Sequence, residues 1–222
     1  MELSPRMALA LELCRGGTRL IDVGCDHASL CIAAVKKAGF AHAIASDLHE
    51  KPLEMAKLHI GICGLSDWVE TRLACGLEGI EPEQADTVAI CGMGGELIAA
   101  ILADAPWTAD GKHRMVLQPM TCADRLRRWL AENGYEIRQE RLAKEGEKLY
   151  IVMEVAGGKD DCGSSYAYLF TEKLRQDPLF PLFLEREMAR ISRACEGRSL
   201  AGLDTARERE LLRQLEVLRH GA

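Results

Sequence analysis

Residues 20–28 read LIDVGCDHA, and residues 88–95 read VAICGMGG. In each stretch a short apolar run ends at a glycine, and a segment that can form a helix follows. This pattern is typical of a buried parallel strand that leads into a helix. Ligands of open α/β sheets bind at this edge, where glycines let a ligand approach the backbone and helix N-termini offer unpaired N–H groups. The two stretches therefore predict an α/β fold with a nucleotide-type cofactor at the carboxyl ends of its strands.

The bulk composition is that of a packed globular protein. The chain has 222 residues, of which 48% are hydrophobic, and a net charge of −6. Residues 166–222 contain ten Lys and Arg against nine Asp and Glu, so the acidity lies upstream of them. This charge argues against holding nucleic acid by bulk attraction, although a local basic face stays open. No apolar run approaches the roughly 20 residues of a membrane span, and no secretion signal begins the chain, so we expect a cytoplasmic protein without membrane contact.

The nine cysteines are odd in number and scattered, and none forms a Cys-x-x-Cys pair. Most are embedded in apolar or small-residue runs. We therefore expect reduced thiols that act as small core residues, and neither a disulfide framework nor a metal site.

The order of elements predicts a doubly wound sheet. We expect strands at residues 18–23, 41–46, 68–73, 87–91 and 114–117, and helices at residues 3–14, 28–38, 50–63, 95–103 and 122–132. Ser4 is expected to cap the first helix. Residues 135–142 and 148–155 read as an antiparallel pair. Five βα units followed by a hairpin predict a Rossmann-like, seven-stranded sheet of the class I S-adenosylmethionine-dependent methyltransferases, because dinucleotide-binding folds alternate to the end.

A polar, glycine-rich break at residues 157–163 predicts a domain boundary, with a Rossmann-like domain at 1–158 and a helical domain at 163–222. Two narrow apolar seams in the second domain predict an α-helical coiled-coil hairpin, with Pro178 and Pro181 marking a bend. The seams consist of Leu184, Met188, Ile191 and Cys195, and of Leu211, Leu215 and Leu218. The arginine-rich outer faces are more typical of solvated surface than of a binding site.

Acidic side chains at the first strand end indicate the charge of the cofactor. Asp26 occupies the position of the second glycine in the usual Gly-x-Gly turn, and a carboxylate there repels the pyrophosphate of NAD or FAD. S-adenosylmethionine carries positive charge on its amino group and its sulfonium. Asp22 and Asp26 therefore favour the methyl donor, although Asp26 is also a candidate helix N-cap and Asp22 a candidate partner of nearby backbone.

Other residues at the strand ends have a functional and a structural interpretation. Asp47 can accept hydrogen bonds from both ribose hydroxyls or cap the next helix. His27 can move a proton near pH 7 or serve as a positioning residue. The glycines at 92, 94 and 95 allow a ligand to lie against the backbone beside Met93, or allow tight packing of a helix.

Four motifs together resemble one family. They are DVGCDHA at 22–28, ICGMGGELI at 90–98, LQP at 117–119 and WLxxNGY at 129–135. In order and spacing they resemble the bacterial tRNA (adenine-N1)-methyltransferase family that acts at tRNA position 22, the TrmK family, over residues 3–155, and the helical hairpin matches more loosely. The resemblance implies S-adenosylmethionine as cofactor and tRNA as partner. The expected cofactor-binding residues are Asp22, Gly24, Asp26, His27, Asp47, Leu48, Cys75, Gly76, Leu77, Gly92, Met93 and Gly94.

One position departs from the family pattern. The family usually has Asp-Gly-Leu where this chain has Cys75-Gly76-Leu77. An acidic residue there would accept a hydrogen bond from the adenine amino group of the cofactor, and a cysteine is a poor acceptor. A backbone carbonyl or another side chain would have to replace it, or cofactor affinity would be weaker.

The resemblance also implies a mechanism in which placement is the main task, because N1 of adenine already has an in-plane lone pair. We expect Asp26 and Met93 to be the catalytic residues, with Asp26 orienting the adenine amino group or stabilising the charge of the product. The base must be turned out of its stack to reach the site. The expected contacts to the RNA are His27, Gln118 and Pro119 at the pocket and Arg6, Arg186, Arg190 and Arg193 on phosphates at a distance from it.

Two other functions stay open on the sequence. A small-molecule methyltransferase would use the same cofactor site without any dependence on tRNA. A non-catalytic binding or assembly module would use the helical hairpin to recruit partners. The sequence does not fix the oligomeric state, for which a monomer is slightly favoured.

Overall fold

The computed structural model describes residues 2–159 and 169–220. It contains two compact units, Met1–Thr171 and Glu172–Ala222. Most of the break predicted at 157–163, from residue 160 onward, lies outside the described residues.

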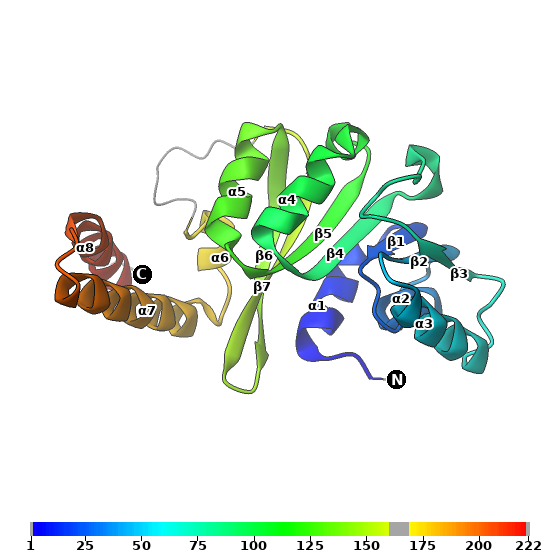
Figure 1. Cartoon of the computed structure of the whole chain (residues 1–222), viewed down its shortest axis with the longest axis horizontal. Helices are drawn as coiled ribbons and strands as arrows, with labels where there is room; N and C mark the ends of the chain where they lie inside the picture. The colour runs from blue at the N-terminus through cyan, green and yellow to red at the C-terminus, as the bar shows by residue number, and fades with distance from the viewer. Residues whose placement is uncertain (1, 160–168, 221–222) are drawn as a thin grey trace. The chain divides into compact units, whose positions relative to one another are not determined.

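The first unit contains a single sheet of seven strands in the order β3-β2-β1-β4-β5-β7-β6 (Figure 1). The strands are β1 (Arg19–Val23), β2 (His42–Asp47), β3 (Val69–Leu73), β4 (Thr87–Gly94), β5 (Arg114–Thr121), β6 (Tyr135–Glu145) and β7 (Lys148–Gly157). Strands β1 to β5 pair in parallel, and β7 runs antiparallel to both β5 and β6. The predicted doubly wound sheet with its reversed last strand is confirmed.

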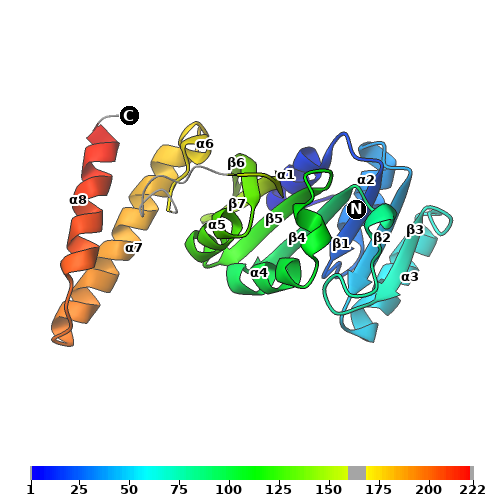
Figure 2. The same cartoon turned by 90° about the horizontal axis from the view of Figure 1, so that it is seen from above.

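Helices cover both faces of this sheet. They are α1 (Pro5–Cys14), α2 (Ser29–Lys37), α3 (Glu50–Ile62), α4 (Gly95–Ala103) and α5 (Ala123–Glu132), with short 3₁₀ helices η1 (Pro82–Gln84) and η2 (Pro106–Ala109). Buried residues of α1, α2 and α3 share one core cluster with the strands. Helix α1 lies on one side of the central strands, and α4 and α5 lie on the other (Figure 2). The layers leave the carboxyl ends of β1, β2 and β4 at a common edge.

Strands β4 and β5 run further than the apolar runs indicate. They were expected to end at residues 91 and 117, but pairing continues through Met93↔Pro119 and Gly94↔Thr121, with register shifts after Cys91 and after Met93. Pro119 cannot donate a ladder hydrogen bond, and irregular pairing is where a strand tolerates proline. The expectation that Gln118 and Pro119 follow the strand is therefore wrong, because both residues belong to β5.

Two further local expectations need correction. Ser4 occupies the N-cap position of α1, but its side chain makes no capping hydrogen bond. The β6–β7 hairpin was expected to open into a loop at residues 143–147, whereas β6 continues to Glu145 and β7 begins at Lys148. The longer hairpin projects beyond the other strands (Figure 1).

The described cysteines are free thiols. Burial above all, and then the negative charges of Asp22 and Asp47, raise the pKa of Cys25 to about 12. Burial likewise raises the pKa of Cys31 and of Cys91 well above the ordinary value. These thiols are therefore neutral packing groups at physiological pH.

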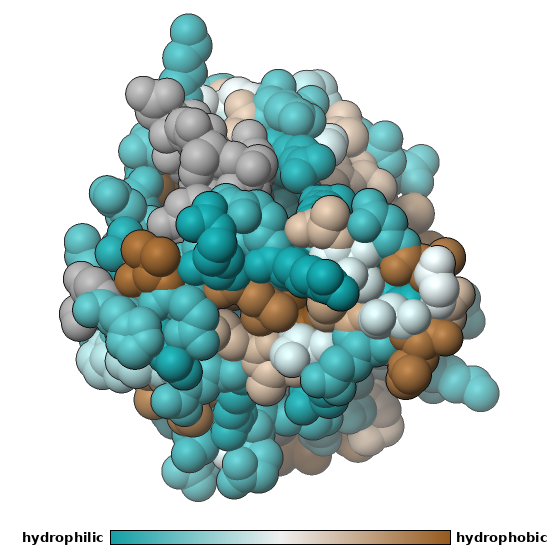
Figure 3. All heavy atoms as spheres, turned by 90° about the vertical axis from the view of Figure 1, so that its left-hand side faces the viewer, coloured by the Kyte–Doolittle hydropathy of each residue, from teal (hydrophilic) through white to brown (hydrophobic). Residues whose placement is uncertain are grey.

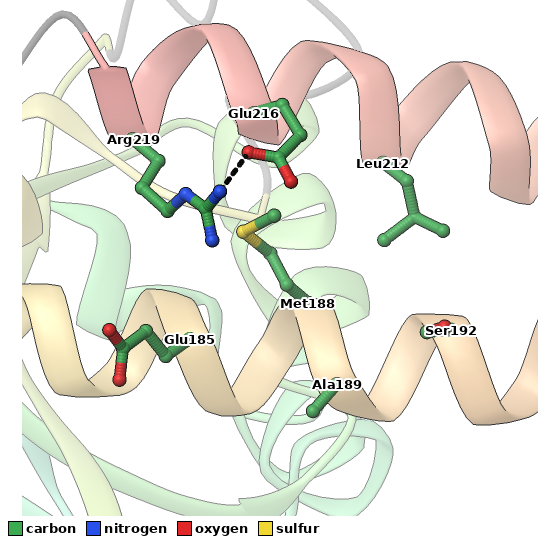
Figure 4. Close-up of a pocket in the computed structure, with 7 residues that line it drawn as sticks. All are labelled: Glu185, Met188, Ala189, Ser192, Leu212, Glu216 and Arg219. Carbon is green, nitrogen blue, oxygen red and sulfur yellow. Dashed lines mark ion pairs between the residues drawn. The ribbon is translucent and has the colours of Figure 1, made fainter.

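The second unit contains α6 (Glu172–Arg175), α7 (Phe180–Leu200) and α8 (Ala206–His220), of which α7 and α8 pack together as a helical hairpin. Of the predicted seams, Leu184, Ile191, Leu215 and Leu218 are buried, whereas Met188, Cys195 and Leu211 are half-buried. A groove of about 400 Å³ lies between the two helices, with Met188 and Leu212 pointing into it and an Arg219–Glu216 ion pair at one end (Figure 4).

Seen from the left-hand side of Figure 1, the surface is mostly hydrophilic, with small separate hydrophobic patches (Figure 3). Within residues 2–159 and 169–220, no helix is long and apolar enough to cross a membrane.

Candidate functional site

The turn after β1 forms a tight connection to the end of β2. The backbone N–H groups of Gly24 and Cys25 donate to the carbonyl of Ser46 over 2.8 and 3.0 Å. Gly24, Asp26 and Ala28 have φ angles of +75°, +50° and +57°. Left-handed backbone at non-glycine residues is uncommon and costs about 1–3 kcal/mol each, so the surrounding contacts must hold this turn in place. The N-cap of α2 is Ala28, and therefore the alternative of Asp26 as a helix cap is wrong.

Three carboxylates meet at this edge. Asp22 is only 3% exposed, and burial raises its pKa to about 7, with further contributions from the negative charges of Asp47 and Asp26. Within the described part of the chain, no Lys or Arg forms an ion pair with any of the three. A buried carboxylate next to two others disfavours its own ionisation, and a cation entering the cluster would reverse this. The cluster therefore fits a positively charged ligand and repels an anionic one.

Asp26 and His27 lie at the open side of the cluster. The side chain of Asp26 is 76% exposed, and its Oδ1 lies 3.5 Å from Nε2 of His27. The imidazole of His27 meets the ring of His59 edge-on at 5.4 Å, and its buried Nδ1 has no hydrogen-bond partner among the described residues. Asp26 is thus accessible to a substrate, whereas Asp22 is accessible only to a ligand that enters the turn.

Asp47 does not cap the next helix, because the N-cap of α3 is His49. Instead, Oδ1 of Asp47 accepts from the backbone N–H of His49 at 2.9 Å, which fixes the turn before the helix. Ser46, the residue before it, is fully buried, and its hydroxyl has no partner within the described residues. Ser46 could not be identified as a site residue from the sequence, where it is marked only as a small polar residue directly before the strand-end aspartate.

Residues 92–94 at the end of β4 lie against the turn that follows β1. A Cβ atom added to Gly24 would lie 2.3 Å from the Cε atom of Met93, so the methionine side chain lies directly against this glycine. Gly92 has a φ of +80°. A Cβ on Gly95 would lie 2.5 Å from the carbonyl oxygen of Cys122. Tight packing is therefore confirmed at Gly95, and Gly92 adopts a left-handed backbone that favours glycine. That a ligand lies against these glycines stays a prediction.

The loop after β3 brings the Cys75 motif to the same edge, since the N–H of Ala74 donates to the carbonyl of Asp47 at 3.1 Å. Leu48 is exposed and Leu77 is buried. Cys75 is exposed, and its carbonyl accepts from the N–H of Glu78 at 3.1 Å. Gly76 has a φ of +59°, and a Cβ there would lie 3.2 Å from the side chain of Ile101 in α4.

Gln118 is fully buried, so its side chain does not form an open pocket wall. Its Oε1 accepts from the N–H of Gly92 at 3.1 Å and from Nη1 of Arg6 at 2.8 Å. Arg6, expected on phosphates at a distance from the pocket, lies instead against the Gly92 segment. The backbone N–H of Arg6 donates to Oε1 of Glu145 at 2.9 Å, a contact that could not be predicted from the sequence. Pro119 lies beside Met93 in the ladder.

The other arginines expected on RNA lie in the second unit. Arg190 pairs with Glu187 in α7 at 2.7 Å, and Arg186 is half-buried. Arg193 is exposed, and no ion pair is found for it within the described residues. Of the arginines on this hairpin, Arg198, Arg213 and Arg219 are also paired with glutamates.

Comparison with known proteins gives a consistent match. Residues 3–153 match the family model of the methyltransferase domain. A tRNA (adenine(22)-N(1))-methyltransferase of Bacillus subtilis is 35% identical over 161 residues, which is 72% of this chain and 68% of the relative.

Two solved structures match almost the whole chain. The Streptococcus pneumoniae protein Sp1610, in complex with S-adenosyl-L-methionine, has a TM-score of 0.86 at 30% identity, over 99% of this chain and 100% of that one. The m1A22 tRNA methyltransferase TrmK of Bacillus subtilis has a TM-score of 0.81 at 30% identity, over 99% and 96% of the two chains. The family resemblance read from the sequence motifs is thereby confirmed. With its seven-stranded methyltransferase sheet and its C-terminal helices, the chain belongs to the TrmK-like tRNA (adenine(22)-N(1))-methyltransferase family.

Proposed function

We propose that this protein transfers a methyl group from S-adenosylmethionine to N1 of adenine 22 in tRNA, in the cytoplasm. The observation that carries the proposal is the group of carboxylates at the turn of Gly24, which forms no ion pair with a Lys or Arg among the described residues and lies under Met93. Family membership supplies the substrate, and the site supplies the charge that a sulfonium donor needs.

The residues present fit S-adenosylmethionine. Asp22 is the carboxylate best placed to meet the positive charge of its methionine part, because Asp22 is buried behind the turn and gains most from a cation. Asp47 keeps one oxygen for His49 and can offer the other to the ribose. Leu48 offers an exposed apolar surface beside it, and the remaining expected positions, Gly76, Leu77 and Gly94, frame the same edge.

S-adenosylmethionine supplies an electrophilic methyl group on its sulfonium. N1 of neutral adenine carries a free lone pair, so no side chain has to remove a proton before attack. The protein therefore works by placement, which alone can lower a barrier by about 7–11 kcal/mol when the reacting atoms are held in line. Met93, which lies against Gly24, and Pro119 beside it exclude water from the place where these atoms meet.

Asp26 is proposed to act on the target base. Its exposed carboxylate can accept a hydrogen bond from the amino group of adenine, which fixes the base with N1 toward the donor. The same negative charge stabilises the positive charge that the ring gains on methylation. His27 lies 3.5 Å away and can hold Asp26 in position.

The test is to incubate the purified chain with labelled donor and unmodified tRNA, and then to map the modified nucleotide. We expect 1-methyladenosine at position 22, and none in a tRNA in which another base replaces adenine 22. Methylation of metabolites without any need for tRNA would favour the small-molecule methyltransferase. Calorimetry that detects no binding of S-adenosylmethionine would favour the non-catalytic module.

Arg193 on α7 is proposed to contact a tRNA phosphate. Arg193→Ala should weaken tRNA binding several-fold at low salt and reduce the slope of log K against log[salt] by roughly 0.7–0.9, the value for one lost phosphate contact. The matched control is Arg213→Ala, because Arg213 is exposed on α8 and paired with Glu210. Filter binding at four salt concentrations measures both quantities. Equal slopes for Arg193→Ala and the wild type would contradict this contact.

A further inference from the structure

Arg6 links three parts of the first unit that are distant in sequence. It stands in the first turn of α1, and its backbone N–H donates to Oε1 of Glu145 at 2.9 Å while its Nε lies 3.6 Å from Oε2. Its guanidinium lies over the ring of Tyr150, 5.5 Å from the centroid. Nη1 donates to Oε1 of Gln118 at 2.8 Å. These contacts to two strands and an aromatic face hold the guanidinium in one place.

Gln118 connects Arg6 to the end of β4 at Gly92. Its Oε1 also accepts from the N–H of Gly92 at 3.1 Å, and its Nε2 donates to the carbonyl of Pro119 at 3.1 Å. Gln118 is fully buried, so if Arg6 or Gly92 no longer donates, its side-chain oxygen is left with one hydrogen bond fewer in the core. Arg6 is thus the charged partner that orients the buried amide, and the amide in turn fixes the backbone at Gly92.

The fixed segment is the one that faces the cofactor turn. Gly92 has a φ of +80° and immediately precedes Met93, and pairing with β5 is irregular on both sides of Met93. Irregular strand pairing restrains the backbone at Met93 only weakly. The hydrogen bond from Gly92 to Gln118 is therefore a main restraint on the position of Met93. The Met93 side chain touches Gly24, where the donor is proposed to bind.

We propose that Arg6 is a positioning residue, which acts through Gln118 on Gly92 and Met93 and does not contact tRNA phosphate. The inference rests on the proposed function for its kinetic readout only. A cation that is engaged by Gln118, Glu145 and Tyr150 has little freedom to neutralise a phosphate, whereas a misplaced Met93 would disturb the alignment of donor and base.

The experiment compares Arg6→Met and Arg6→Lys with Arg141→Ala as matched control. Arg141 also ties β6 to α1, through Glu12 at 2.6 Å, but it does not touch Gln118. We expect Arg6→Met to lower the single-turnover rate at saturating tRNA by about ten-fold or more, with tRNA affinity and its salt slope unchanged. Arg6→Lys should recover little of the rate, because an ammonium cannot replace the fixed fork of the guanidinium. Arg141→Ala should behave as the wild type.

A second measurement does not depend on activity. Amide hydrogen exchange at Gly92 should be faster in Arg6→Met than in the wild type and Arg141→Ala, because the acceptor of this N–H is no longer oriented. Combined with Gln118→Leu, Arg6→Met should add almost nothing to the rate defect, since both act through one link. Unchanged exchange at Gly92 in a folded Arg6→Met variant overturns the proposal. So does a loss of tRNA affinity with a shallower salt slope at an unchanged rate. A wild type that methylates no tRNA refutes the proposed function instead, and the exchange result still decides the role of Arg6.

Discussion

Asp22→Asn is expected to stabilise the cofactor-free protein at pH 8 and to weaken its binding of S-adenosylmethionine by about 100-fold, the loss of a charged partner worth roughly 2–3 kcal/mol. Burial above all, and then Asp47 and Asp26, raise the pKa of Asp22 from 3.8 to about 7. The folded state therefore holds this proton over a pH range in which the unfolded state has lost it. The free energy of unfolding falls as pH rises from about 4 to 7, and the shift corresponds to at most about 4 kcal/mol at pH 8.

Asparagine carries no charge at any pH, so Asp22→Asn removes the free-energy cost of ionising a buried carboxyl group in the folded state. Denaturant unfolding at pH 8 should show Asp22→Asn to be more stable than the wild type, and the difference should shrink as pH is lowered toward 4. Asp86→Asn is the control of opposite sign. Although burial raises the pKa of Asp86, hydrogen bonds from Thr18 lower it below its ordinary value, so its contribution is present at neutral pH and is lost as pH falls. An Asp22→Asn protein that binds the donor as tightly as the wild type would remove Asp22 from the proposed site.

The centre of the sheet could be predicted from the sequence because β1, β2 and β4 are largely apolar runs that end at or just before a glycine or an acidic residue. The ends of β4 and β5 could not be predicted. Gly92, Gln118 and Pro119 have low strand propensity, and they continue the ladder only because a partner strand and the buried Gln118 amide hold them there. Local strand propensity therefore does not predict the ends of β4 and β5, which lie at the proposed site.

The site divides in the same way. The carboxylates could be found because strand-end residues meet at one edge whatever the details of packing. The Arg6–Gln118 and Arg6–Glu145 bonds join residues 112 and 139 positions apart, and no spacing in the sequence marks them. The sequence therefore predicts a phosphate contact for Arg6, whereas the structure places its side chain against Gln118 and Glu145. Nothing in the sequence around Arg6 indicates that it will bind Glu145 in the β6–β7 hairpin.

Gly95→Ala is expected to destabilise the first unit by about 2–3 kcal/mol, the cost of overpacking a filled site, which lowers the melting temperature by roughly 5–10 °C. Gly95 begins α4, and alanine in a helix is normally favoured over glycine by about 0.5–1 kcal/mol. Here the added Cβ would lie 2.5 Å from the carbonyl oxygen of Cys122 and 3.0 Å from that of Thr121. Both contacts are backbone, which cannot move aside as a side-chain tip can, so α4 must shift away from the end of β5.

The matched control is Gly61→Ala in α3, where an added Cβ meets nothing within 4 Å and should stabilise slightly. Thermal unfolding of both variants measures the contrast. We also expect Gly95→Ala to lose donor binding at temperatures where it is still folded, because a shifted α4 displaces Gly94 and, with it, Met93 above Gly24. A Gly95→Ala protein as stable as Gly61→Ala would mean that the α4–β5 contact is looser than 2.5 Å implies. The fourth residue of the Gly-Met-Gly-Gly motif would then have to be explained by the ligand and not by packing.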